Sequence, residues 1–89
     1  SGMYAKVDIP TIVKETLVIP AKSIVIKDLA EYVFLAKENK ASKIKITTGI
    51  SSGDKIEVVS EKINAGDMII VDGQYLLDDQ DSVRIVENR

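Results

Sequence analysis

The stretch that decides the fold of this chain is TGISSGDKIEVVSEKINAGDMIIVDG, residues 48–73. It contains the same short pattern twice, with Gly53-Asp54 in the first copy and Gly66-Asp67 in the second. In each copy apolar residues follow at alternate positions. Glycine adopts positive φ angles without a steric cost, and aspartate hydrogen-bonds to nearby backbone groups. Each copy therefore predicts a tight turn that leads into a β-strand.

The alternation of apolar and polar residues continues on both sides of this stretch. Strands are expected over residues 4–9, 12–19, 24–26, 32–36, 43–48, 55–59, 68–71 and 83–86. Residues 27–31 have room for one helical turn, and residues 73–77 predict a helical turn or an irregular apolar segment. The sequence thus predicts an all-β domain, a small β-roll or barrel of about seven short, mostly antiparallel strands with at most one short helical turn.

Turns and strand boundaries are expected at residues that favour special backbone conformations. These structural turn residues are Pro20, Gly49, Gly53, Asp54, Gly66, Asp67 and Gly73.

The composition excludes several classes of function. The chain has 89 residues, a formal net charge of -2 and a pI of about 5.0, which argue against a free-standing nucleic-acid binder. It contains no cysteine and no histidine. Thiolate nucleophiles, disulfides and imidazole chemistry are therefore absent. We expect no catalytic residue, no cofactor and no metal site.

Two groups of aspartates were considered as sites. Asp78, Asp79 and Asp81 lie close in sequence, as in a calcium loop, but the glycine and glutamate that an EF-hand requires are missing. A solvated turn is favoured. Asp54 and Asp67 are a conceivable acid-base pair, but their places after glycine in matched turns explain them without chemistry.

Lysines suggest two further hypotheses. Lys40 lies in the hydrophilic segment at residues 37–42, which is expected to connect two strands of a hairpin. It resembles the modified lysine of lipoyl and biotinyl carrier domains, although only Lys-Ala of their usual Asp-Lys-Ala sequence is present. A carrier domain is the alternative function. Lysines also accumulate in the first half of the chain. Contact with anionic lipid heads or an acidic partner explains them as well as protection of strand edges does.

Short motifs follow one another in a fixed order. They are Ile19-Pro20, Val33-Phe34-Leu35, Thr48-Gly49, Gly53-Asp54 and the segment GDMIIVDG at residues 66–73. In this order the chain resembles the C-terminal, membrane-proximal domain of periplasmic adaptors, the HlyD-like membrane fusion proteins of RND-type tripartite efflux pumps. GMYAKV at residues 2–7 is similar to the segment that closes the preceding β-barrel domain of these adaptors. Residues 61–63 depart from the Ser-Gly-Leu of the family.

The resemblance implies a non-catalytic docking domain. Such adaptors link an inner-membrane RND transporter to an outer-membrane channel for substrate export, and the rest of the full-length adaptor contacts the channel. The implied location is the periplasm, with the full-length protein attached to the inner membrane.

The resemblance also implies a division of the chain. Residues 1–10 correspond to the end of a preceding β-barrel domain or to a lead-in strand, and residues 11–89 to the membrane-proximal β-roll domain. The family domain takes strands from the far N-terminus of the protein, so this piece is expected to have an unpaired edge. Such edges favour self-association, which sedimentation would detect.

Overall fold

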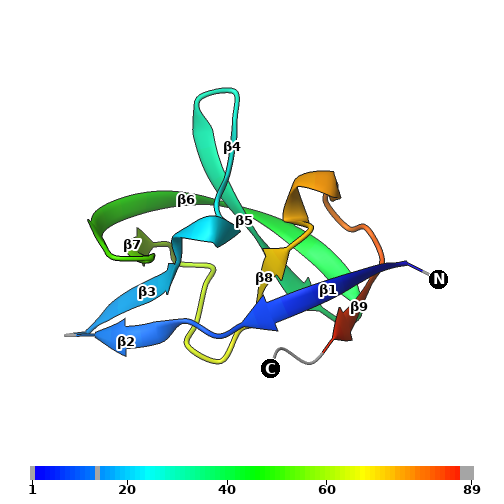
Figure 1. The fold of residues 1–89 in the computed structure, drawn as a ribbon, viewed down its shortest axis with the longest axis horizontal. Helices are drawn as coiled ribbons and strands as arrows, with labels where there is room; N and C mark the ends of the chain where they lie inside the picture. The colour runs from blue at the N-terminus through cyan, green and yellow to red at the C-terminus, as the bar shows by residue number, and fades with distance from the viewer. Residues whose placement is uncertain (1, 14, 87–89) are drawn as a thin grey trace.

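The computed structural model describes residues 2–13 and 15–86. They form an all-β domain in which a single sheet curls around its own interior (Figure 1). The nine strands are β1 (Met3–Asp8), β2 (Thr11–Val13), β3 (Thr16–Pro20), β4 (Val25–Lys27), β5 (Ala30–Lys37), β6 (Lys40–Ser52), β7 (Lys55–Val59), β8 (Ile69–Asp72) and β9 (Val83–Val86). Two single turns of 3-10 helix, η1 (Ala21–Ser23) and η2 (Gln74–Leu76), complete the fold. The predicted fold class is confirmed.

The structure has more elements than the sequence predicted, for identifiable reasons. The single strand expected over residues 12–19 is two strands, β2 and β3, which pair as a hairpin next to Glu15 at φ 65°. Of the two alternatives expected for residues 73–77, the structure has the helical turn, η2, and η1 adds a second one. Residues 27–31 hold no helical turn, because a two-residue turn at Asp28 and Leu29 joins β4 to β5.

The sheet is almost entirely antiparallel. Its strand order is β2-β3-β7-β6-β5-β8-β1-β9, with β4 attached to β5, and among the described strands only β1 and β9 pair in parallel. Strand β6 is 13 residues long and pairs with both β5 and β7. An irregularity in the β6–β7 register between Thr48 and Ser51 accompanies the bend of β6.

The curled sheet partly closes on itself. The start of β9 returns to the start of β6, where Lys40 and Ser82 form a bridge. The backbone N–H of Ala41 donates to the carbonyl of Asp81 at 2.8 Å, and that of Val83 donates to the carbonyl of Asn39 at 2.9 Å. Strand β1 lies between β8 and β9 in the same sheet. The domain boundary at residue 10 stays a prediction.

Apolar residues fill two cores, one on each side of the central strands. The first core consists of Ile19, Ile24, Val33, Leu35, Ile44, Ile46, Val58, Ile63, Ile69 and Val71. The second core consists of Ala5, Phe34, Ala36, Ala41, Ile70, Leu77 and Val83. Alternate residues of β5 and β8 enter the two cores, so both strands are buried on both faces. This explains why their sequences are continuous apolar runs instead of alternating ones.

Candidate functional site

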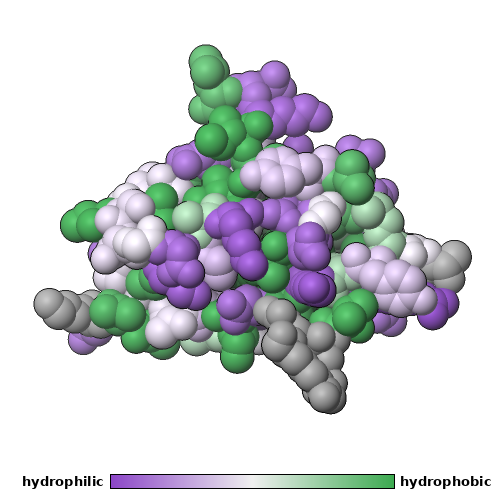
Figure 2. All heavy atoms as spheres, viewed as in Figure 1, coloured by the Kyte–Doolittle hydropathy of each residue, from purple (hydrophilic) through white to green (hydrophobic). Residues whose placement is uncertain are grey.

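A hairpin formed by β4 and the first half of β5 projects from the body of the domain (Figure 1). Strand β4 pairs only with β5, through Val25–Tyr32, Ile26–Glu31 and Lys27–Ala30. Its tip carries two large apolar residues. Ile26 is 71% exposed, and Leu29, at 103% of the reference exposure, is fully exposed. Figure 2 shows apolar surface at the end of this projection. We call Ile26, Lys27, Asp28 and Leu29 the hairpin tip.

The backbone of the hairpin tip adopts a conformation that its sequence does not favour. Asp28 and Leu29 have φ angles of 53° and 65°, as a two-residue hairpin turn requires. Aspartate tolerates this region, but leucine is disfavoured there by about 1 kcal/mol. The Leu29 side chain is not buried inside the domain, so no burial offsets this cost. The combination of an exposed apolar residue and a strained turn makes the hairpin tip a candidate contact site for another molecule.

The base of the hairpin is firmly held, in contrast to its tip. The Tyr75 hydroxyl donates to the carbonyl of Ile24 at 3.1 Å, and the Gln74 side-chain amide donates to the carbonyl of Lys22. Gln74 is 2% exposed, so a buried side chain makes this partly buried bond. On the opposite strand the Thr48 hydroxyl donates to the Glu31 carboxylate at 3.0 Å. Turns η1 and η2 therefore fix the direction in which the hairpin projects.

Most residues expected at turns lie at the ends of strands. Pro20 ends β3, and its carbonyl accepts a hydrogen bond from the buried Ser23 hydroxyl at 2.7 Å. Gly53, at φ 61°, and Asp54 form the two-residue turn between β6 and β7, where the Asp54 carbonyl accepts from the Ala21 N–H at 2.8 Å. Gly73, at φ 78°, precedes η2.

The second Gly-Asp pair is built differently from the first. Gly66 and Asp67 lie in the loop between β7 and β8, two strands that are not neighbours in the sheet. The Asp67 carboxylate accepts a hydrogen bond from the Asn64 N–H at 2.8 Å. Gly66 does not adopt a positive φ.

Gly49 is a correction to the sequence prediction, because it lies inside β6 and not in a turn. A Cβ atom at this position would lie 2.8 Å from Oε1 of Glu57 on the neighbouring strand. The same oxygen accepts a hydrogen bond from the Ile50 N–H at 3.2 Å. A side chain at this position would displace the flexible end of Glu57 and would lie 3.2 Å from its Cβ atom, so glycine suits a close cross-strand approach here.

The aspartates considered as a metal or catalytic site serve the backbone. The Asp79 carboxylate accepts from the Lys43 N–H at 2.9 Å, and that of Asp81 accepts from the Asp78 N–H at 2.8 Å. Among residues 2–13 and 15–86, no three His, Cys, Asp or Glu side chains are arranged to hold a metal ion. Asp54 and Asp67 lie in separate turns, and no hydrogen bond joins them in the described part of the chain.

Lys40 occupies a different position from that of a carrier lysine. The turn of the β5–β6 hairpin is formed by Glu38 and Asn39, at φ 52° and 63°, and Lys40 is the first residue of β6 after it. On the side away from β5, the backbone of Lys40 is bridged to Ser82. Lys37 lies directly opposite Lys40 in the ladder. The lysine is exposed but belongs to a paired strand, so the carrier hypothesis gains no support from its position.

Sequence reasoning missed the hairpin tip. The apolar run of residues 24–26 and that of residues 32–36 were expected to be strands, but residues 27–31 between them were expected to have room for one helical turn. Asp-Gly between two such runs would have predicted a hairpin. Leu29 stands where that signal has glycine.

Comparison with known proteins identifies the family. Residues 16–85 match the family described as YknX, C-terminal permuted SH3-like domain. The chain belongs to this family. YknX is a member of the efflux-pump membrane fusion proteins, so the domain is a membrane fusion protein domain, and such adaptor domains are typically non-enzymatic. No curated protein matches the chain.

The matched segment of this YknX-type domain contains the whole β4–β5 hairpin and both 3-10 turns. No helix in the described part of the chain has the length and apolar character needed to cross a membrane.

Proposed function

We propose that this YknX-type domain is a non-catalytic docking module of an efflux adaptor, and that its hairpin tip contacts the extracytoplasmic part of a membrane transporter. The observation that carries the proposal is Leu29, fully exposed on a turn whose backbone disfavours leucine. Family membership supports the adaptor role.

The charge of the hairpin favours a protein partner over an anionic lipid surface. Between residues 25 and 32, Lys27 is accompanied by two acidic residues, Asp28 and Glu31. Anionic membranes attract segments with an excess of Lys and Arg, which this hairpin lacks. A narrow projection with an apolar end instead fits an apolar pocket on a folded partner, where one or two buried side chains supply most of the affinity.

The finer assignment comes from the resemblance noted in the sequence. It names an RND-type inner-membrane transporter as the docking partner and an outer-membrane channel as the partner of the rest of the adaptor. On this proposal the domain lies in the periplasm, and the full-length adaptor is attached to the inner membrane. Purification of the full-length adaptor with its bound transporter tests the transporter class directly.

The docking role is tested by two substitutions in the full-length adaptor, Leu29→Asn and Ile26→Thr. Each removes an apolar side chain from the hairpin tip and leaves its hydrogen-bonded base intact. We expect the dissociation constant for the transporter to rise about tenfold or more, as for loss of a buried anchor in an interface. The measurement is an affinity titration in detergent or nanodiscs.

Ile50→Thr is the matched control, because Ile50 is also an exposed isoleucine, at 72%, but lies on β6 near the Gly53-Asp54 turn. It should leave the affinity unchanged. Equal affinities of the wild type, Leu29→Asn and Ile26→Thr would refute the proposal.

A further inference from the structure

One face of the β4–β5 hairpin continues across β6 and carries three lysines. In an antiparallel sheet, residues directly opposite one another point to the same face, and residues along a strand alternate between the two faces. The pairs that share this face are Val25–Tyr32, Lys27–Ala30, Tyr32–Lys45 and Phe34–Lys43. It is the face of the second core, which contains Phe34 and against which Val25 packs. We call Lys27, Tyr32, Lys43 and Lys45 the basic face.

The tyrosine of the basic face holds one of the lysines in place. The Lys43 ammonium lies 4.3 Å from the centre of the Tyr32 ring, which is a cation–π contact. Lys43 and Tyr32 are half-buried, whereas Lys27 and Lys45 are exposed. A partner that contacts Lys43 therefore restricts a side chain that is already ordered, which lowers the entropy cost of binding.

The acidic residues near the hairpin do not neutralise this face. Glu31 lies opposite Ile26 and so belongs to the other face. Asp28 is in the turn, and the Asp79 carboxylate accepts a hydrogen bond from the Lys43 N–H at 2.9 Å. None of the three lysines forms an ion pair in the described part of the chain. With three lysines against these two carboxylates, the basic face keeps a net positive charge.

We propose that the basic face binds an acidic segment of the membrane transporter, so that the docking site holds the hairpin between an apolar wall and an acidic wall. This inference rests on the proposed docking function and adds the chemistry of the partner surface. Ile26 is on the face opposite the lysines, and Leu29 is in the turn. Complementary charges steer the encounter and fix the orientation, while buried apolar anchors supply most of the affinity.

The geometry of the hairpin favours a concave protein surface over anionic lipid. A layer of lipid headgroups attracts clusters of lysines, and β6 supplies two that the hairpin itself does not contain. However, a flat layer that contacts the basic face leaves the exposed Ile26 on the far side. A cleft that surrounds the hairpin contacts both faces at once.

The test uses the full-length adaptor and the transporter that copurifies with it. Lys27→Glu and Lys45→Glu should each raise the dissociation constant about fivefold or more at low salt, because an attraction becomes a repulsion. The increase should shrink at high salt, which screens exposed charges. Lys45→Arg keeps the charge and should bind like the wild type. Both lysines are exposed, so these variants should stay folded, which thermal unfolding checks.

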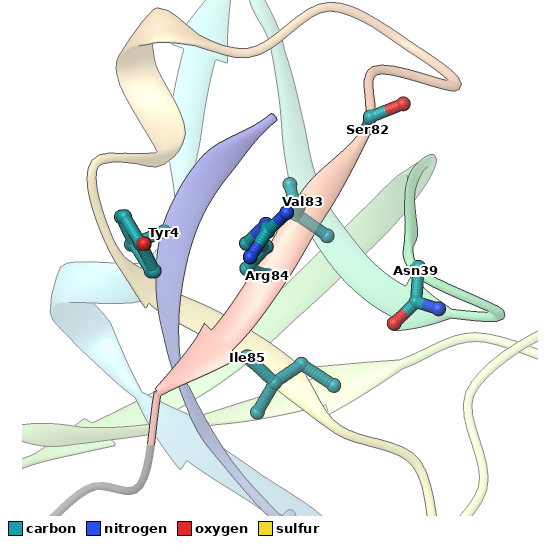
Figure 3. Close-up of a pocket in the computed structure, with 6 residues that line it drawn as sticks. All are labelled: Tyr4, Asn39, Ser82, Val83, Arg84 and Ile85. Atoms are coloured by element: carbon teal, nitrogen blue, oxygen red, sulfur yellow. The ribbon is translucent and has the colours of Figure 1, made fainter. Parts of the chain in front are cut away.

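Two cations outside the basic face are matched controls. Lys37 is an exposed lysine on the same strand, but it lies five residues from Tyr32 and therefore on the opposite face. Arg84 is exposed on β9, three strands from β5 in the sheet order, where Figure 3 shows it lying toward Tyr4. Lys37→Glu and Arg84→Glu make the same change of charge and should leave the affinity unchanged.

Carbodiimide cross-linking tests the acidic wall directly, since the reagent joins a lysine amine to a carboxylate as an amide with loss of water. We expect cross-links from Lys27 or Lys45 to aspartate or glutamate of the transporter. Vesicles of phosphatidylglycerol should bind the 89-residue chain no better than vesicles of phosphatidylcholine do.

Wild-type affinity of both Lys→Glu variants would overturn the inference. The docking function would still stand in that case if Leu29→Asn weakened binding. Equal weakening by the Lys37 and Arg84 controls would also overturn it, because only the total charge would then matter. Preferential binding to phosphatidylglycerol that Lys45→Glu abolishes, without cross-links to the transporter, would overturn it in favour of a lipid contact.

Discussion

Asp79 illustrates, at the scale of one residue, how an exposed carboxylate organises backbone. Its oxygen accepts from the Lys43 N–H and, at 3.3 Å, from the Gln80 side chain, which ties the acidic loop to β6. The hydrogen bond from the Lys43 backbone, and then that from Gln80, favour the charged form and lower the pKa of Asp79 below its ordinary value of 3.8.

A pH dependence follows from this lowered pKa. A carboxylate whose folded pKa is depressed stabilises the fold above its unfolded pKa, and the contribution is lost as the pH falls through the folded pKa. We expect an NMR titration of the Asp79 carboxyl carbon to give a midpoint below 3.8. Asp79→Ala should lower stability at neutral pH and should flatten its decline below about pH 4. A midpoint at or above 3.8 contradicts this account.

At the scale of elements, the β4–β5 hairpin conflicts with its own turn sequence. Leu29→Asn places a residue that tolerates positive φ at the strained position. We expect the free energy of unfolding to rise by about 0.5–1 kcal/mol, or the melting temperature by several degrees, in thermal unfolding of the isolated chain.

Leu29→Ala is the control for this gain, because alanine removes the same apolar surface but also disfavours positive φ. It should leave stability nearly unchanged. Combined with the binding experiment, Leu29→Asn should stabilise the domain while weakening the transporter contact. A loss of stability in Leu29→Asn would show that the leucine packs within the domain.

The sequence repeat is a further lesson at this scale. Its two copies have similar patterns, but Ile50 is 72% exposed whereas its counterpart Ile63 is 3% exposed. The Gly-Asp pair of the first copy forms the two-residue turn between the neighbouring strands β6 and β7. That of the second copy lies in the loop that connects β7 to β8, two strands that are not neighbours in the sheet. Local patterning therefore produced two similar strands in unlike surroundings.

At the scale of the whole molecule, the two cores share strands β5 and β8 and should unfold together. Phe34 in the second core is 2% exposed, and its neighbours Val33 and Leu35 are in the first core. Phe34→Ala should cost about 3–5 kcal/mol, a large part of the stability of a small domain.

The measurement is thermal unfolding followed by methyl NMR signals of Val58 in the first core and Val83 in the second. The two signals should disappear in one transition, in the wild type and in the conservative variant Phe34→Leu. Melting of Val83 well before Val58 would show that the cores are independent.

Most of the strands and the fold class were determined by sequence alone, because the period-two pattern of apolar residues and the Gly-Asp turns act over a few residues. The Gly53 turn, the buried run of β5 and the inward Ile44 and Ile46 all follow from such local rules. Such local rules do not give the order of strands, the split of residues 12–19 into β2 and β3, or the position of Gly49 inside β6.

The exposure of the hairpin tip was decided by the tertiary structure. Leu29 is exposed because the body of the domain leaves its hairpin without a neighbour. This exposure depends on contacts between residues far apart in the chain. A local pattern of apolar and polar residues specifies which segments become strands, but not which hairpin is left without a neighbour.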